Sequence, residues 1–109
     1  MASYPGDKFL IEVAGILIEH VAPHSVVSMG GEEFCIVMQG LDNGEASALV
    51  DSARQKIEST PMGLQQPISV RVSAGVATTL WGTLDQKINA ADALLYRAKD
   101  NGRNQVVHE

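Results

Sequence analysis

The residues best suited to chemistry lie in the segment Gly30-Gly31-Glu32-Glu33-Phe34, in which two glycines precede two acidic side chains. Glycines at the tip of a hairpin let a ligand lie directly against the backbone, because no side chain stands in the way. Two adjacent carboxylates beside that surface can hold Mg²⁺, a hard cation that also coordinates substrate phosphates. A tight turn with solvated acidic side chains is the simpler interpretation of the same segment.

Cysteine and histidine contribute little chemistry to this sequence. The single cysteine, Cys35, excludes an internal disulfide and a Cys-based zinc site. It follows Phe34 in an apolar segment with no histidine nearby, which favours a buried inert thiol over a nucleophile. The three histidines, His20, His24 and His108, are dispersed along the chain, so we do not expect a His-based metal site.

The composition is that of a small acidic globular chain. It has 109 residues, 45% of them hydrophobic and 19% charged, which suits one domain spanning residues 1–109. A formal net charge of −5 argues against nucleic acid as a partner, because duplex binding needs clustered Lys and Arg, but it permits a local nucleotide site. No apolar run reaches the roughly 18 residues of a membrane span. The opening residues also lack a signal-peptide pattern, so we expect a cytoplasmic location without membrane association.

The first element that must position these residues is a helix. The sequence predicts that it begins at Asp7 as N-cap and ends before Pro23. Apolar residues recur along it at helical spacing. Because Phe9, Ile11 and Ile16 widen this apolar face, we expect the helix to be buried on more than one side.

The remaining elements alternate between strands and helices. Two β-prone segments, residues 25–29 and 34–38, flank the acidic segment and predict an antiparallel hairpin. Alternating residues over 68–76 predict a strand of period 2. Helices over 46–57 and from Thr83 or Asp85 to Gly102, with a short strand at 106–107, complete the order α-β-β-α-β-α-β. This order is typical of an α+β fold with helices packed on an antiparallel sheet.

Residues 91–104, ADALLYRAKDNGRN, resemble the closing signature of GGDEF domains, the diguanylate cyclase family. The usual form is ADxALYxAKxxGRN, from which Leu94 departs. Residues 72–77, VSAGVA, look like that family's SxGvA strand, and GGEEF is similar to its signature loop. Gly6-Asp7 matches the pair that opens the helix before the loop. The resemblance runs from about residue 6 to residue 107 and implies a nucleotidyl-cyclase or ferredoxin-like palm fold.

The resemblance also implies a reaction and a cofactor. Two GTP molecules, one on each domain of a homodimer, condense to cyclic di-GMP and pyrophosphate with the help of Mg²⁺. Carried over to this sequence, Glu32 would ligate the metal, and Glu33 would be the catalytic residue beside the metal and the reacting 3′-hydroxyl. Gly30 and Gly31 would let the α-phosphate and the ribose approach the backbone.

Three further residues acquire nucleotide-binding roles from the resemblance. Asp7 would accept hydrogen bonds from the guanine edge. Lys99 and Arg103 would bind the terminal phosphates, and their i, i+4 spacing makes them neighbours on one helix face. A solvated basic helix end, favoured by the helix dipole, is the alternative interpretation of that pair.

The family pattern includes an N-terminal part that this sequence lacks: a strand with DxDxFK, a helix with Asn-Asp, and a Gly-His pair. In the family, that strand supplies a second acidic Mg²⁺ ligand and lies at the centre of the sheet, and the Asn is a second guanine contact. Val21-Ala22-Pro23-His24 occupies the place of the RxxD product-inhibition motif. We therefore expect no RxxD site and no product feedback through it.

These observations together predict an N-terminally truncated GGDEF-like domain of cyclic di-GMP signalling. We expect a partial GTP and Mg²⁺ half-site in the GGEEF loop, with little or no catalysis. The alternative is an active diguanylate cyclase that completes its site in a homodimer, or a fragment of a longer enzyme of that kind.

The absence of this strand also suggests that two chains associate. Without it, the strands at 34–38 and 68–76 would each lose a neighbour, and open apolar edges invite pairing with another chain. Either the two strands pair directly, or two chains pair their edges to form one sheet. The apolar helix beginning at Asp7 adds hydrophobic surface, so we expect a homodimer formed through strands or through this helix.

Overall fold

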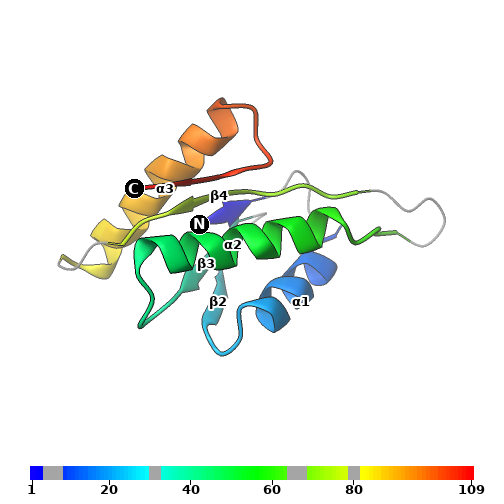
Figure 1. Cartoon of the computed structure of the whole chain (residues 1–109), viewed down its shortest axis with the longest axis horizontal. Helices are drawn as coiled ribbons and strands as arrows, with labels where there is room; N and C mark the ends of the chain where they lie inside the picture. Colours follow the sequence, from blue (N-terminus) through cyan, green and yellow to red (C-terminus); the bar gives the residue numbers. More distant parts are fainter. Residues whose placement is uncertain (4–8, 30–32, 64–68, 79–81) are drawn as a thin grey trace.

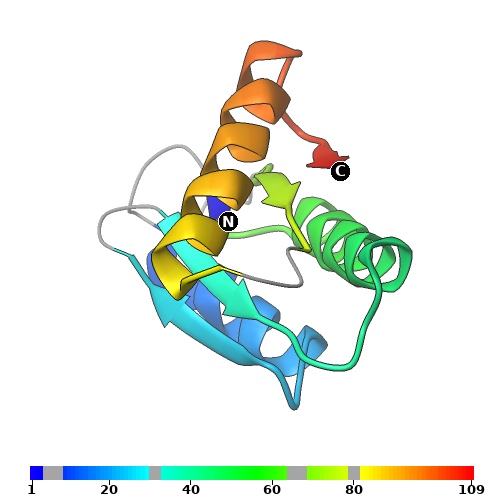
Figure 2. The ribbon, with the colours of Figure 1, turned by 90° about the vertical axis from the view of Figure 1, so that its left-hand side faces the viewer.

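The chain folds as helices on both faces of a central sheet (Figure 1). The structure is a computed structural model, and it describes residues 1–3, 9–29, 33–63, 69–78 and 82–109. Figure 2 shows α3 (Leu84–Asp100) on one side of β4 (Ser73–Val76) and α2 (Asn43–Glu58) on the other. Helix α1 (Leu10–His20) shares the face of α2, because side chains from both helices meet in one apolar cluster. The expected α+β architecture is confirmed.

The sheet has the strand order β2-β3-β1-β4-β5. Strands β2 (Ser25–Ser28) and β3 (Glu33–Val37) form the predicted antiparallel hairpin, with Val26 opposite Ile36. Strand β1 (Ala2–Ser3) is antiparallel to both β3 and β4. The edge strand β5 (Val106–His108) confirms the predicted last strand, and it runs parallel to β4. The sheet is therefore antiparallel except for this one edge pairing.

The N-terminal residues occupy the centre of the sheet. Ala2 lies opposite Phe34 on one side and Ala74 on the other. The expectation that β3 and β4 would each lose their neighbour is therefore wrong, and so is the suggestion that the two strands pair directly; edge pairing between two chains stays a prediction. The physical reason is that a two-residue strand is long enough to pair with both neighbours at once.

Helix α1 buries one face and exposes the other. Val13 and Leu17 are buried, whereas Ile11 is 86% exposed and Ile18 is 56% exposed. The expectation that this helix is buried on more than one side is thus wrong, because α2 and the sheet cover it from one direction only. Asp7, the predicted N-cap, lies outside the described residues.

Capping boxes begin the two longer helices. The Asp42 carboxylate accepts the Glu45 N–H at 2.8 Å, and Glu45 accepts the Asp42 N–H at 3.2 Å. Thr83 and Gln86 form the same reciprocal pair at the start of α3, which decides between the two predicted caps in favour of Thr83. These caps satisfy backbone donors that a helix N-terminus otherwise leaves unpaired.

Strand β4 is shorter than the predicted segment 68–76 and is buried on both faces. Its four residues are all buried, although the sequence pattern around them alternates with a period of two. The reason is that α2 and α3 sandwich this strand from opposite sides. In the described part of the chain, no helix is both long enough and apolar enough to span a membrane.

Candidate functional site

Glu33 is the one member of the predicted acidic pair that the structure describes. It begins β3, is half-buried, and its carbonyl accepts the Met29 N–H at 2.9 Å, which closes the hairpin ladder. Gly30, Gly31 and Glu32 lie outside the described residues, as does Asp7. The roles carried over to those four residues therefore stay predictions.

The residue of the central strand that lies opposite Glu33 carries a hydroxyl group and not a carboxylate. Ser3 lies directly opposite Glu33 in the β1–β3 pair. Residues opposite each other in an antiparallel pair present their side chains on the same face, with Cβ atoms roughly 5 Å apart. Ala2, the other residue of β1, is buried on the side of α2. Neither residue of β1 can thus donate the acidic ligand that the family's central strand carries.

The amino terminus extends the pairing of β1 by one residue. The Met1 amino group donates to the Gly75 carbonyl at 3.1 Å, and the Gly75 N–H donates to the Met1 carbonyl at 2.9 Å. Burial lowers the pKa of this amino group below its ordinary value, while Cys35, Asp92 and Glu33 oppose the shift. The neutral amine is therefore favoured in the folded chain more than in the unfolded one.

The C-terminal end of α3 holds Lys99 and Arg103 together. The Arg103 N–H donates to the Ala98 carbonyl at 2.9 Å, and the Gly102 N–H donates to the Lys99 carbonyl at 3.4 Å. This pair of bonds, with Gly102 at φ 110°, is a Schellman motif. Lys99 is half-buried on the last turn of α3, whereas Arg103 is exposed in the turn that follows. The expectation that the two are neighbours on one helix face is wrong, because the helix ends at Asp100 and the Arg103 backbone is left-handed.

Asn104 fixes the turn that carries Arg103. Its side chain donates to Glu58 at 2.5 Å and accepts from Arg54 at 3.1 Å, both on α2. Its backbone N–H donates to the Ser73 hydroxyl at 3.0 Å, which ties the same turn to β4. Sequence reasoning gave Asn104 no role, although the residue closes the quoted signature. These hydrogen bonds hold the turn that contains Arg103, whose backbone φ is 64°.

Arg54 also organises the surface of α2 beside this turn. It donates to the Asp51 carboxylate at 2.7 Å, and this hydrogen bond is the main reason that the pKa of Asp51 lies below its ordinary value. The Arg54 guanidinium thus joins Asp51 on its own helix to Asn104 on the turn. The basic end of α3 is supported by a polar network and not by apolar contacts alone.

Gly75 sets the distance between α3 and the sheet. A Cβ atom built on it would lie 2.2 Å from the Leu95 nitrogen and 2.3 Å from the Ala91 oxygen. Only glycine allows the helix backbone this close to β4. Ser73 and Gly75 are the two defining positions of the SxGvA motif, so the motif has a physical role: one anchors the Arg103 turn, and the other admits α3.

The described residues bring together part of the predicted site. Lys99 and Arg103 share one helix end, whereas Glu33 comes from β3. Among the residues that the structure describes, no group of three or more His, Cys, Asp or Glu side chains could hold a metal ion. A carboxylate on β3 still suits Mg²⁺, which prefers oxygen ligands and keeps several waters.

Comparison with known proteins identifies the family. The model of the family "Diguanylate cyclase, GGDEF domain" matches residues 4–105. The chain therefore belongs to the GGDEF domain family, and the resemblance seen in the sequence is confirmed.

Curated relatives and solved structures agree with this assignment. The chain is 31% identical over 108 residues to the probable diguanylate cyclase DgcT of Escherichia coli, covering 94% of this chain and 24% of the relative. It is 33% identical over 104 residues to the bifunctional diguanylate cyclase/cyclic di-GMP phosphodiesterase MucR of Pseudomonas aeruginosa, covering 91% of this chain and 15% of the relative. The chain thus spans a quarter or less of the length of these relatives.

Solved structures of GGDEF domains share the fold of this chain. The active GGEEF domain of a diguanylate cyclase from Vibrio cholerae superposes with a TM-score of 0.88 at 24% identity, covering 98% of this chain and 78% of that one. The GGDEF domain of DgcB from Caulobacter crescentus, solved with c-di-GMP, gives a TM-score of 0.84 at 20% identity, covering 98% of this chain and 74% of that one. These likenesses establish a GGDEF fold.

Proposed function

We propose that this chain forms a GGDEF domain that binds GTP weakly through a partial half-site and has little or no cyclase activity. Its role would lie in cyclic di-GMP signalling, the context that the names of its relatives give. The observation that supports a weakened site is the composition of β1. Ala2 and Ser3 occupy the central strand beside Glu33 and bring no second carboxylate to it.

In this proposal, the GGEEF loop supplies the metal-binding side of the half-site. Glu32 ligates Mg²⁺, and Glu33 lies beside the metal and the reacting hydroxyl. Gly30 and Gly31 admit the α-phosphate and ribose to the backbone, and Asp7 accepts from guanine. With fewer carboxylates, Mg²⁺ retains more waters and binds less tightly, which weakens the charge stabilisation that phosphoryl transfer requires.

Lys99 and Arg103 supply the phosphate-binding side. Both lie at one helix end, and the Schellman motif and Asn104 hold the Arg103 backbone in place. Because the backbone beneath the two cations is fixed, less conformational freedom is lost when they bind the terminal phosphates, and these residues can retain GTP even where the metal is weakly held.

An active diguanylate cyclase that works as a homodimer is the second candidate function. The GGEEF form of the loop favours it, because the active GGEEF domain from Vibrio cholerae has the same form of the loop. Helix α1 offers a surface through which two copies could meet, since Ile11 and Ile18 are largely exposed. Two half-sites facing each other could then share catalytic groups.

Calorimetry with GTP and Mg²⁺, run beside an assay for cyclic di-GMP, distinguishes the two candidates. The partial site predicts binding at roughly 10 μM or weaker, with product formation far below an ordinary enzymatic rate. Glu32→Ala should weaken the Mg²⁺-dependent part of the binding. Submicromolar affinity with rapid product formation would instead establish the active cyclase, and an unchanged Mg²⁺ dependence in Glu32→Ala would remove that residue from the metal role.

A further inference from the structure

The outer face of α1 carries a row of exposed apolar positions. Ile11 is 86% exposed, more than any other large hydrophobic side chain in the described part of the chain, and Ile18 is 56% exposed. Gly15 lies between them, so the three positions follow the i, i+4, i+7 spacing of one helix face. Figure 1 shows α1 at the rim of the molecule, beside α2. These three positions form the apolar row of α1.

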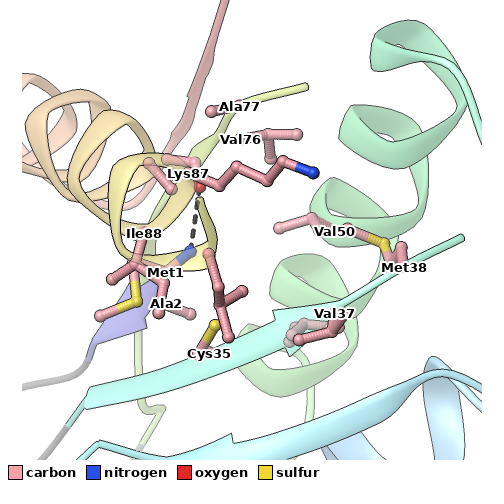
Figure 3. A pocket seen from close by; sticks show the side chains of 14 residues that line it. Met1, Ala2, Cys35, Val37, Met38, Val50, Val76, Ala77, Lys87 and Ile88 are labelled. Carbon is pink, nitrogen blue, oxygen red and sulfur yellow. Dashed lines mark hydrogen bonds between the residues drawn. The ribbon is translucent and has the colours of Figure 1, made fainter. Parts of the chain in front are cut away.

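Other exposed apolar side chains have apolar neighbours within the chain. Val37 and Leu84 are 40% and 61% exposed, yet both line the pocket between the sheet, α2 and α3 that Figure 3 shows. Ile11 and Ile18 differ, because neither is among the described side chains that pack on the cluster shared by α1, α2 and the sheet. Exposed apolar residues that gather on one face and lie outside the core mark an interaction surface.

Gly15 makes a notch in the apolar row. A Cβ atom built on it would meet nothing within 4 Å, so the space above this glycine is open. Glycine is also unfavourable inside a helix, where alanine would be more stable. The notch has a use when a large side chain of a second helix enters it, with Ile11 and Ile18 on either side, as in the packing of two helices. Helix α1 has 11 residues, or about 16 Å, which is long enough for such a contact.

Acidic side chains follow the apolar row on one flank. Glu12 and Glu19 each come one position after an isoleucine of the row, and both are exposed. Among the residues that the structure describes, neither of them forms an ion pair. On the other flank, Leu10 and Ala14 pack on the core cluster. Within α1, the free charge beside the row is therefore negative.

This charge decides between the possible occupants of the row. In an antiparallel pair of two copies centred on Gly15, Glu12 of one copy would lie beside Glu19 of the second, and like charges flanking a helix pair oppose its formation. A homodimer through this face, which the second candidate function would use, is thereby disfavoured. An anionic membrane is disfavoured too, because helices that lie on such membranes carry Lys or Arg on their polar face. A helix with basic residues beside an apolar stripe fits both the row and its charge.

We infer that the outer face of α1 binds a basic amphipathic helix of a partner protein. A large apolar side chain of the partner enters the notch at Gly15, and its apolar neighbours on the same face pack against Ile11 and Ile18. Lys or Arg residues beside that stripe pair with Glu12 and Glu19, so the apolar row supplies contact area and the acids select the partner. This binding does not depend on GTP.

A designed peptide tests the inference on the isotopically labelled 109-residue chain. The probe is a helical peptide of about 18 residues, with leucine at helical spacing and lysine on both flanks of the leucine stripe. Its control peptide carries glutamate in place of every lysine. Amide chemical shifts should move saturably at residues 10–20, with a Kd of about 10–100 μM for the basic peptide and at least a ten-fold weaker one for the acidic peptide. Equal affinities would overturn the charge pairing, and shifts gathered elsewhere would overturn the site.

Two variants of α1 separate binding from folding. Gly15→Gln fills the notch with a better helix former, so it should weaken the basic peptide about ten-fold while it melts at or above the parent chain. The double change of Glu12→Lys and Glu19→Lys should reverse the preference, so that the acidic peptide becomes the tighter ligand. Undiminished binding to Gly15→Gln, or an unreversed preference in the double variant, would refute the proposed contacts.

A matched control and one measurement of mass complete the experiment. Asp92→Lys combined with Asp100→Lys makes the same change in net charge at exposed positions of α3, and it should keep the preference for the basic peptide. Loss of the preference there would show that net charge, and not α1, selects the peptide. Light scattering should find the parent chain monomeric. A dimer that Ile18→Gln dissolves would show that a second copy occupies the apolar row and would overturn the inference.

Discussion

Replacement of Gly75 by alanine tests how α3 is positioned over the sheet. The added methyl group would lie 2.2 Å from the Leu95 nitrogen, 2.3 Å from the Ala91 oxygen and 2.7 Å from the Leu94 carbonyl carbon. All three are backbone atoms, so no side-chain rotation can relieve the overlap. The helix must withdraw by roughly 1 Å, and overpacking of this kind costs about 3 kcal/mol.

The matched control is Gly15→Ala, on the exposed face of α1. A Cβ atom there meets nothing within 4 Å. Alanine is the better helix former, so this variant should gain up to about 1 kcal/mol. Thermal unfolding should show Gly75→Ala melting roughly 12 °C or more below the parent chain and Gly15→Ala at or above it. If Gly75→Ala melted with the parent chain, α3 could not lie against β4 as described.

Three further predictions concern the turn, the amino terminus and α1. Asn104→Asp places a carboxylate against Glu58, so thermal unfolding should report a loss of about 1–2 kcal/mol in the free energy of unfolding. Calorimetry should report weaker GTP binding. An unchanged melting temperature would show that the hydrogen bond between Asn104 and Glu58 does not stabilise the turn. Because burial lowers the pKa of the Met1 amine, the unfolded chain binds more protons than the folded chain as the pH approaches 8.0 from below. The free energy of unfolding should therefore rise with pH up to that value. The same rise after N-terminal acetylation would exclude this amine as the cause. If α1 mediates a homodimer, the paired change of Ile11 and Ile18 to Glu should halve the mass seen by light scattering, and a monomeric parent chain would refute the dimer.

Local signals in the sequence predicted most of the fold. The hairpin followed from two β-prone segments around the glycines, and the start of α3 followed from Thr83, whose capping box the structure contains. Burial was harder to predict, because it depends on which face a neighbour covers. Ile11 extends an apolar pattern yet is 86% exposed, and β4 alternates in sequence yet is buried on both faces.

The centre of the sheet and the support of the site depend on contacts that are distant in sequence. Nothing in Ala2 and Ser3 predicts a strand, because two residues carry no periodicity; their pairing is decided by the space between β3 and β4. Helical spacing did not predict how Lys99 and Arg103 are placed, because α3 ends at Asp100 and Arg103 lies in the turn beyond it. Asn104 could not be linked to Glu58 and Ser73, since those contacts join residues 46 and 31 positions apart.

The central claim is that the half-site is weak because Ser3, and not an acidic residue, lies opposite Glu33 on the central strand. Ser3→Asp restores a carboxylate at that position, and Ser3→Asn is the uncharged control of the same shape. The decisive measurement is calorimetric titration of GTP into each chain with and without Mg²⁺. We predict that Ser3→Asp tightens binding about ten-fold in Mg²⁺ but not in its absence, where the two carboxylates repel each other, and that Ser3→Asn matches the parent chain. Submicromolar Mg²⁺-dependent binding by the parent chain, unimproved in Ser3→Asp, would contradict the account.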